Sequence, residues 1–146
     1  MKIIVLAGGL STERDVSLSS AAGICRTLVE KGHDAFLLDV FMGLENAPEN
    51  LEDVFTLPDH GLEIVKNIST EEPDLEAVKA SRPDQSDCFF GPNVIELCRL
   101  ADITFLGLHG GEGENGKLQA SFDLLGIKYT GPDSLGCAVA MHKGVA

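Results

Sequence analysis

Apolar runs and a helical pattern alternate along the first forty residues of the chain. Lys2–Ala7 is a short apolar run of the kind that forms a buried strand. Apolar residues then recur at helical spacing from about residue 15 to residue 31, and Gly32 suits the end of that helix. Asp34–Val40 predicts the next strand, and a crossover of this length implies parallel, right-handed pairing. The apolar face of the helix consists of Leu18, Ala21, Ala22, Cys25, Leu28 and Val29.

The pattern is regular again from residue 90 to the end. We predict a helix over Pro92–Leu100, because proline fits the first turn of a helix. Ile103–Leu108 is continuously apolar, as expected of a strand covered on both faces. Three more elements follow: a helix from Asn115 or Gly116 to Gly126 with Leu118, Phe122 and Leu125 on one face, a strand over Ile127–Tyr129, and a helix over Ser134–His142. This alternation predicts an α/β fold with a Rossmann-like parallel sheet flanked by helices.

Residues 42–90 form a less regular, acidic insertion in this pattern. Val54–Leu57 and Leu62–Val65 flank a four-residue turn, which predicts a β-hairpin. We expect His60, in that turn, to be solvated. We expect Glu71–Gln85 to be flexible.

Composition and charge limit the classes of partner. The chain has 146 residues, which suits one domain. Its formal net charge of −12 argues against nucleic acid and anionic membranes as partners. No apolar run approaches the roughly 18 residues of a membrane span, and the first residues lack a signal-peptide pattern. The four cysteines lack metal or C-x-x-C spacing and are expected to be reduced, and the four histidines do not cluster into a zinc site.

Two glycine-containing loops follow predicted strands. Gly8–Ser17 follows the first strand and pairs acids and hydroxyls with one arginine. It is neither a G-x-G-x-x-G dinucleotide motif nor a P-loop. Thr12 and Asp15 have capping-box spacing, which leaves Glu13 without a structural role. His109–Ala120 follows the strand at 103–108, where open α/β sheets bind ligands. The alternative for the second loop is a surface turn with a solvated glutamate.

Three segments together carry a resemblance to a known family. GGLSTERDVSLSS resembles the first signature of D-alanine–D-alanine ligases, and HGGEGENGKLQA resembles the second. The stretch from Gly126–Gly131 through Met141–Lys143 is similar to the segment that leads into the family's ATP-binding domain, although His142 stands where the family usually has aspartate. The resemblance implies a pre-ATP-grasp domain over residues 1–131, with 132–146 beginning the connection to an ATP-grasp domain absent from this sequence.

The resemblance also implies roles for single residues. Glu13 matches the family glutamate that holds the ammonium group of the first D-alanine and supports catalysis. Val16, Ser17 and His109 match residues beside that substrate. The alternative for His109 is a ring packed under its loop with one nitrogen hydrogen-bonded.

Three further residues of these segments are candidates for contact. Gly110 and Glu114 are candidate loop contacts, although the Glu114 carboxylate could instead accept bonds from loop or helix N–H groups. Lys143 is the one candidate for cofactor contact, and no metal ligand is expected in this chain.

In the family, ATP with Mg²⁺ or Mn²⁺ converts one D-alanine to an acyl phosphate, which the amine of a second D-alanine attacks. The dipeptide serves peptidoglycan synthesis in the bacterial cytoplasm, and family members are usually homodimers. Because family members are considerably longer, this chain is expected to be an inactive N-terminal part. The alternatives are a stand-alone amino-acid-binding module and a nucleotide-binding Rossmann domain, against which the missing G-x-G-x-x-G motif argues. The choice of D-alanine, D-serine or D-lactate as second substrate stays open.

Overall fold

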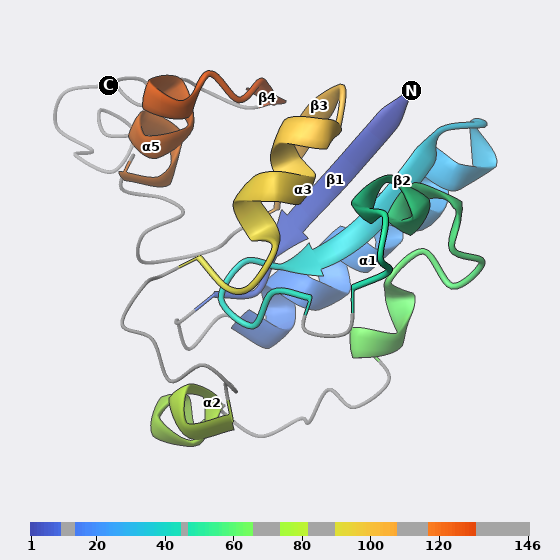
Figure 1. The fold of residues 1–146 in the computed structure, drawn as a ribbon. Helices are drawn as coiled ribbons and strands as arrows, with labels where there is room; N and C mark the ends of the chain where they lie inside the picture. The colour runs from blue at the N-terminus through green and yellow to red at the C-terminus, as the bar shows by residue number, and fades with distance from the viewer. Residues whose placement is uncertain (10–13, 45–46, 66–73, 82–89, 108–116, 131–146) are drawn as a thin grey trace, which may run out of the picture.

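Four parallel strands form one sheet in the computed structural model, which describes residues 1–9, 14–44, 47–65, 74–81, 90–107 and 117–130 (Figure 1). The strand order is β2-β1-β3-β4, so β1 lies inside the sheet. β1 pairs along its whole length with β2 and, from Ile3 to Leu6, with β3. The parallel α/β fold expected from the sequence is therefore confirmed. The strand bounds are β1 Lys2–Ala7, β2 Asp34–Asp39, β3 Ile103–Leu106 and β4 Tyr129–Thr130.

The helices of the first and last thirds lie close to their expected positions. α1 spans Arg14–Glu30, α3 spans Val94–Leu100 and α5 spans Lys117–Leu125. Gly32 and Gly126, just after α1 and α5, have φ angles of 90° and 72°, which glycine tolerates best. Both helix ends expected at these glycines are thus confirmed.

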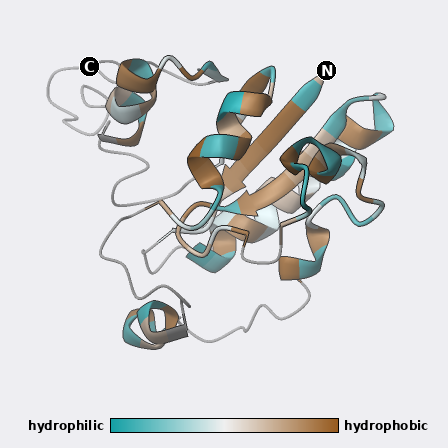
Figure 2. Ribbon diagram, viewed as in Figure 1, coloured by the Kyte–Doolittle hydropathy of each residue, from teal (hydrophilic) through white to brown (hydrophobic). Residues whose placement is uncertain are grey.

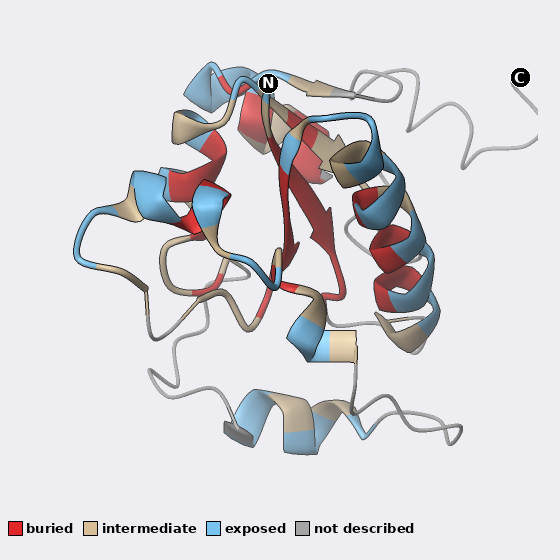
Figure 3. Ribbon diagram, turned by 90° about the vertical axis from the view of Figure 1, so that its right-hand side faces the viewer, coloured by how far each residue is buried: buried red, intermediate tan, exposed pale blue. Residues whose placement is uncertain are grey.

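Helices cover both faces of the sheet. Successive residues of a strand point to opposite faces, so each strand contributes side chains to both layers. Ile4 and Leu6 pack with α3, α5 and η1 (Leu51–Thr56) on one side, and Ile3 and Val5 pack with α1 on the other. Figure 2 shows the apolar strands between these layers, and Figure 3 shows the buried stripe of α1 turned toward the sheet. This double cover explains why β1 reads as a continuous apolar run.

Several boundaries differ from the sequence expectation. α3 begins two residues after Pro92, because Asn93 adopts a left-handed conformation (φ 66°) immediately before the helix. β3 ends at Leu106 and only Thr104 is fully covered in it. Leu125 is 37% exposed, although it was expected on the inner face of α5.

The hairpin expected over residues 54–65 is wrong. The two apolar runs belong instead to short 3₁₀ helices, η1 and η2 (Leu62–Val65). Asn50 caps η1 by accepting a hydrogen bond from the N–H of Glu52, and the adjacent residues Val54 and Phe55 are both buried. In a strand these two side chains would point to opposite faces, and one of them would be exposed. Packing against β2 and α3 therefore decided the local conformation.

The turn between these helices also differs from expectation. His60 is half-buried rather than solvated, because its Nδ1 lies 3.1 Å from the Ala35 carbonyl oxygen. Its own carbonyl accepts a hydrogen bond from Leu37 N–H at 2.9 Å. The turn is therefore attached to β2.

The described part of the acidic region contains one further helix. α2, Leu75–Ser81, falls in the stretch expected to be flexible and lies apart from the sheet (Figures 1 and 3). Flexibility of this stretch stays a prediction. Because only parts of residues 42–90 are described, an insertion as such stays a prediction. Within the described ranges, no helix is both long and apolar enough to cross a membrane. The helix expected over Ser134–His142 lies outside them.

Candidate functional site

The two glycine-containing loops begin side by side at the carboxyl edge of the sheet. The chain passes from β1 to β2 on one side and later returns to β3 on the other side of β1. The point where the strand order reverses in this way is where open α/β sheets bind ligands. The loop after β1 starts at Gly8, and the loop after β3 starts at Gly107.

Ser17, in the first turns of α1, connects these two loops. Its hydroxyl donates a hydrogen bond to the carbonyl oxygen of Gly107 at 2.6 Å and accepts one from Gly8 N–H at 3.0 Å. The residue is fully buried. One side chain thus holds the ends of β1 and β3 against the start of α1.

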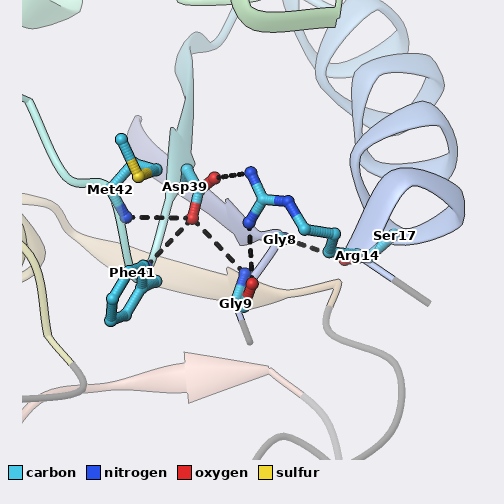
Figure 4. Close-up of polar contacts among 7 residues, drawn as sticks. All are labelled: Gly8, Gly9, Arg14, Ser17, Asp39, Phe41 and Met42. Atoms are coloured by element: carbon cyan, nitrogen blue, oxygen red, sulfur yellow. Dashed lines mark hydrogen bonds and ion pairs between the residues drawn. The ribbon is translucent and has the colours of Figure 1, made fainter. Parts of the chain in front are cut away.

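Arg14 and Asp39 form a second connection at the same edge (Figure 4). Arg14 Nη2 lies 2.6 Å from Asp39 Oδ2, and Nη1 donates to the Gly9 carbonyl oxygen at 2.7 Å. Asp39 Oδ1 accepts from the N–H groups of Gly9, Phe41 and Met42 at 3.3, 2.9 and 3.2 Å. The side chains are 11% and 5% exposed, so water screens the pair little.

Close approach to Asp39 explains the glycine at position 8. Gly8 has a φ of 78°, and a Cβ there would lie 2.7 Å from the Asp39 carboxylate. Any side chain at this position would therefore be strained and would displace Asp39.

The same contacts argue against a nucleotide-binding Rossmann domain. In such domains an acidic residue after the second strand bonds the ribose. Asp39 has that place in the chain, but both its oxygens are occupied by Arg14 and backbone N–H groups. A dinucleotide site at this edge would therefore lack its acidic ligand as well as its glycine motif.

The structure describes only some of the predicted site residues. Val16 is 59% exposed on the first turn of α1, and Ser17 is buried between the loops. The remaining candidates, Glu13, His109, Gly110, Glu114 and Lys143, lie outside the described residues. Substrate contact by any of these residues stays a prediction.

Sequence reasoning assigned no role to Asp39 or Arg14. A usable signal was present for Asp39, because an acid at the end of the buried run Phe36–Leu38 requires a partner. The identity of that partner, 25 residues away in the chain, follows only from the fold.

The described residues were compared with the ligand set that a divalent metal needs. Within the ranges that the structure describes, no group of three or more metal-ligating side chains could hold an ion. We therefore derive no step through a bound metal from these residues.

Two cysteines lie on the inner faces of helices and away from this edge. Burial raises the pKa of the Cys25 thiol to about 11, although the nearby Arg26 lowers it. Burial also raises the pKa of the Cys98 thiol to about 11, and the charge of Glu96 adds to this shift. These thiols remain protonated at neutral pH and are packing residues.

The sheet and the contacts of Ser17 define an open α/β domain with a switch point between β1 and β3 at its carboxyl edge. The family model described as the D-ala D-ala ligase N-terminus matches residues 2–132. The chain belongs to this family, which confirms the resemblance.

Known relatives agree with this assignment. The D-alanine–D-alanine ligase of Lacticaseibacillus casei is 47% identical over 143 residues, which are 98% of this chain and 40% of that protein. Among solved structures, the D-alanine–D-alanine ligase of Coxiella burnetii has a TM-score of 0.55 and 25% identity, covering 98% of this chain and 39% of that one. The VanG D-Ala:D-Ser ligase of Enterococcus faecalis has a TM-score of 0.55 and 26% identity with the same coverage. The chain thus spans about two fifths of the length of these relatives.

Proposed function

We propose that this chain is the substrate-binding N-terminal domain of an ATP-dependent D-alanine–D-alanine ligase. The observation that carries the proposal is the hydrogen-bonded connection through Ser17, which brings together the starts of the two loops that resemble the family signatures. Two loops held in this way can present their side chains to one small ligand.

Each candidate residue has a chemical task in this proposal. The Glu13 carboxylate pairs with the ammonium group of the first D-alanine, because a charge-assisted hydrogen bond fixes both position and orientation. His109 contributes to the same pocket, with Gly110 and Glu114 as further loop contacts. Val16, an exposed apolar residue beside the loop, suits the methyl group of D-alanine.

Ser17 has a different task in the proposal. Its hydroxyl has already used its one proton on Gly107, so only a remaining oxygen lone pair is available to a ligand. We infer that Ser17 serves the substrate mainly by holding the loops, with direct contact through that lone pair as the lesser role.

The remaining parts of the proposal concern the whole protein. Residues 1–131 form the N-terminal domain, and 132–146 begin the connection to a domain that binds ATP and Mg²⁺ or Mn²⁺, to which Lys143 contributes. The reaction joins the carboxylate of one D-alanine to the amine of a second, with ATP converted to ADP and phosphate. The product serves peptidoglycan synthesis in the bacterial cytoplasm, and the protein acts as a homodimer on D-alanine without nucleic-acid or membrane partners.

The test is an assay of the full-length protein that contains this chain. Phosphate release from ATP should require D-alanine and should accompany formation of the dipeptide. D-serine and D-lactate, each supplied with D-alanine, determine the choice of second substrate. Binding of D-alanine without phosphate release would favour the alternative, an amino-acid-binding module without catalysis.

A further inference from the structure

We propose that the end of α5, with the residues that lead into β4, is the surface through which two copies of this chain associate. This α5 patch consists of Leu124 and Leu125 together with Asp123 and Lys128. The inference deepens the proposed function and rests on it, because it names the surface that the partner copy covers in the proposed homodimer.

Two neighbouring leucines form the apolar centre of the α5 patch. Leu124 is 90% exposed, the largest fraction among the exposed large hydrophobic residues that the structure describes, and Leu125 is 37% exposed. The others, Met1, Val16 and Ile64, lie singly elsewhere along the chain. A single exposed apolar side chain is ordinary, whereas adjacent ones on one helix end give a partner an apolar surface to cover.

The α5 patch is held in one conformation by hydrogen bonds at the end of the helix. Gly126, with a φ of 72°, donates its N–H to the Asp123 carbonyl oxygen at 3.3 Å. Ile127 N–H donates to the Phe122 carbonyl oxygen at 3.0 Å. The Tyr129 hydroxyl donates to Asp123 Oδ1 at 3.0 Å. A surface that is already ordered loses little conformational freedom on association, which favours binding.

Charge favours a second copy of this chain as the occupant. The whole chain has a formal net charge of −12, so two copies repel each other over most of their surfaces. Asp123 and Lys128 are both exposed and leave the α5 patch without net charge. A two-fold axis places the same patch of both copies together, so Asp123 of each copy can pair with Lys128 of the other. A basic partner would instead be steered toward the acidic remainder of the chain.

The position of the α5 patch leaves room for a second copy and keeps the candidate site open. β4 lies at an edge of the described sheet, and Figure 1 shows α5 beside it, away from α1 and α2. α5 ends just before β4 begins, and all four strands are parallel. Leu124 and Leu125 therefore lie toward the amino edge of the sheet, opposite the carboxyl edge where Gly8 and Gly107 begin their loops.

The experiment measures the dissociation constant of the dimer by sedimentation velocity, with the full-length protein at a series of concentrations. Leu124→Gln should raise this constant about a hundredfold or more, because one change removes an apolar side chain from both halves of a two-fold contact. The monomer should stay folded, since Leu124 is 90% exposed and glutamine resembles leucine in helix propensity. KM for D-alanine should stay at the wild-type value.

Ile64→Gln is the matched control. Ile64 is an aliphatic residue that is 40% exposed on η2, so this change removes a similar side chain outside the α5 patch and should leave the dissociation constant unchanged. Charge reversal tests the proposed pairing directly. Lys128→Glu should weaken the dimer, and Asp123→Lys in the same chain should restore part of the affinity, because the pair forms again with opposite signs.

Two results of the sedimentation experiment would overturn the inference. One is a wild type that stays monomeric, and the other is a dimer whose dissociation constant is the same in Leu124→Gln. If Leu124→Gln fails to fold, hydroxyl-radical footprinting of the wild type decides. Oxidation of Leu124 should decrease as the concentration rises into the dimer range. Oxidation that does not change with concentration would overturn the inference, because the patch would then be open in the dimer or covered by another part of the ligase in the monomer.

Enzyme assays on the same samples separate this inference from the proposed ligase activity. A dimer that Leu124→Gln weakens, without phosphate release that depends on D-alanine, would overturn the ligase activity and support the α5 patch. A monomeric wild type that ligates D-alanine would overturn the homodimer and this inference, and it would support the ligase activity.

Discussion

At the scale of single residues, the site edge depends on polar side chains that bond to backbone groups. Ser17 and Asp39 together satisfy the backbone of Gly8, Gly9 and Gly107. Such groups are costly to leave unpaired when buried. Each of these two side chains therefore affects two loops or strand ends at once.

Replacing Ser17 should destabilise the domain. Ser17→Ala leaves Gly8 N–H and the Gly107 carbonyl without their partner, and the expected loss in the free energy of unfolding is about 1–3 kcal/mol. Urea denaturation followed by circular dichroism measures this loss. Ser19→Ala is the control, because Ser19 is exposed on the same helix and gains the same helix propensity. Equal stabilities of the two variants would contradict the role given to Ser17.

Replacing Glu13 should impair catalysis more than folding. Glu13→Gln keeps the size of the side chain and removes the charge that is proposed to pair with the substrate ammonium. Loss of a charge-assisted hydrogen bond of roughly 1.5–3 kcal/mol predicts a decrease in kcat/KM of about tenfold to a hundredfold. Kinetics with D-alanine in the full-length protein, alongside a thermal melt, test this. Full activity with a melting temperature lower by many degrees would identify Glu13 as a capping residue.

The residues of the site differ in how far the sequence revealed them. Glu13 and His109 stand out because they carry charge or a titratable ring within glycine-rich segments that have a family pattern. The contacts of Ser17 with Gly107 and of Arg14 with Asp39 join positions 90 and 25 residues apart. No local pattern encodes such pairs, since they arise only when β2 and β3 take their places on either side of β1.

At the scale of elements, long periodic segments were predicted well and short apolar runs were not. The seventeen residues of α1 give enough turns for a helical period to be recognised. Val54–Leu57 is too short to distinguish a strand from a tight helix. There the burial of two adjacent side chains, Val54 and Phe55, decided the conformation.

The inner faces of α1 and α3 should protect their cysteines from alkylation. A pKa of about 11 instead of the ordinary 9.0 lowers the thiolate fraction of Cys25 and Cys98 about a hundredfold near neutral pH. Labelling with iodoacetamide at pH 8, resolved by peptide mass spectrometry, should be slow in the folded chain and fast in urea. Equal rates in both states would contradict this packing.

These thiols also predict the direction of a pH effect on stability. Their folded-state pKa values lie above the ordinary value, so they favour the folded state below about pH 9. That contribution should decrease as the pH rises from about 9 to about 11. A free energy of unfolding that increases over this interval would contradict the assignment.

At the scale of the whole molecule, the chain carries one side of a proposed site. It spans about two fifths of the length of its relatives. The described residues offer no metal-ligating cluster. The part of the site that we propose on this chain lies at the β1/β3 edge, where Ser17 connects Gly8 with Gly107.

The isolated 146-residue chain should consequently fold, bind D-alanine weakly and not ligate it. Few polar contacts and little enclosure predict a Kd in the millimolar range or weaker, about 4 kcal/mol of binding free energy. Chemical-shift perturbation by NMR measures this, with L-alanine as the control ligand. Micromolar binding would show that the pocket is complete without further domains. D-alanine-dependent phosphate release by this chain would show that catalysis also needs no further domain.

The hydrogen bond from Ser17 to Gly107 also determines when the site can form during synthesis. The ribosome has to make 90 further residues after Ser17 before its acceptor exists. A nascent chain that has released only β1, α1 and β2 can pair those two strands, but β1 still lacks its other neighbour. Contacts between positions so distant in the chain form late, because the intervening segment must first be ordered. The ligand edge is thus completed only after β3 leaves the ribosome, and a growing chain carries the first loop without its partner until then.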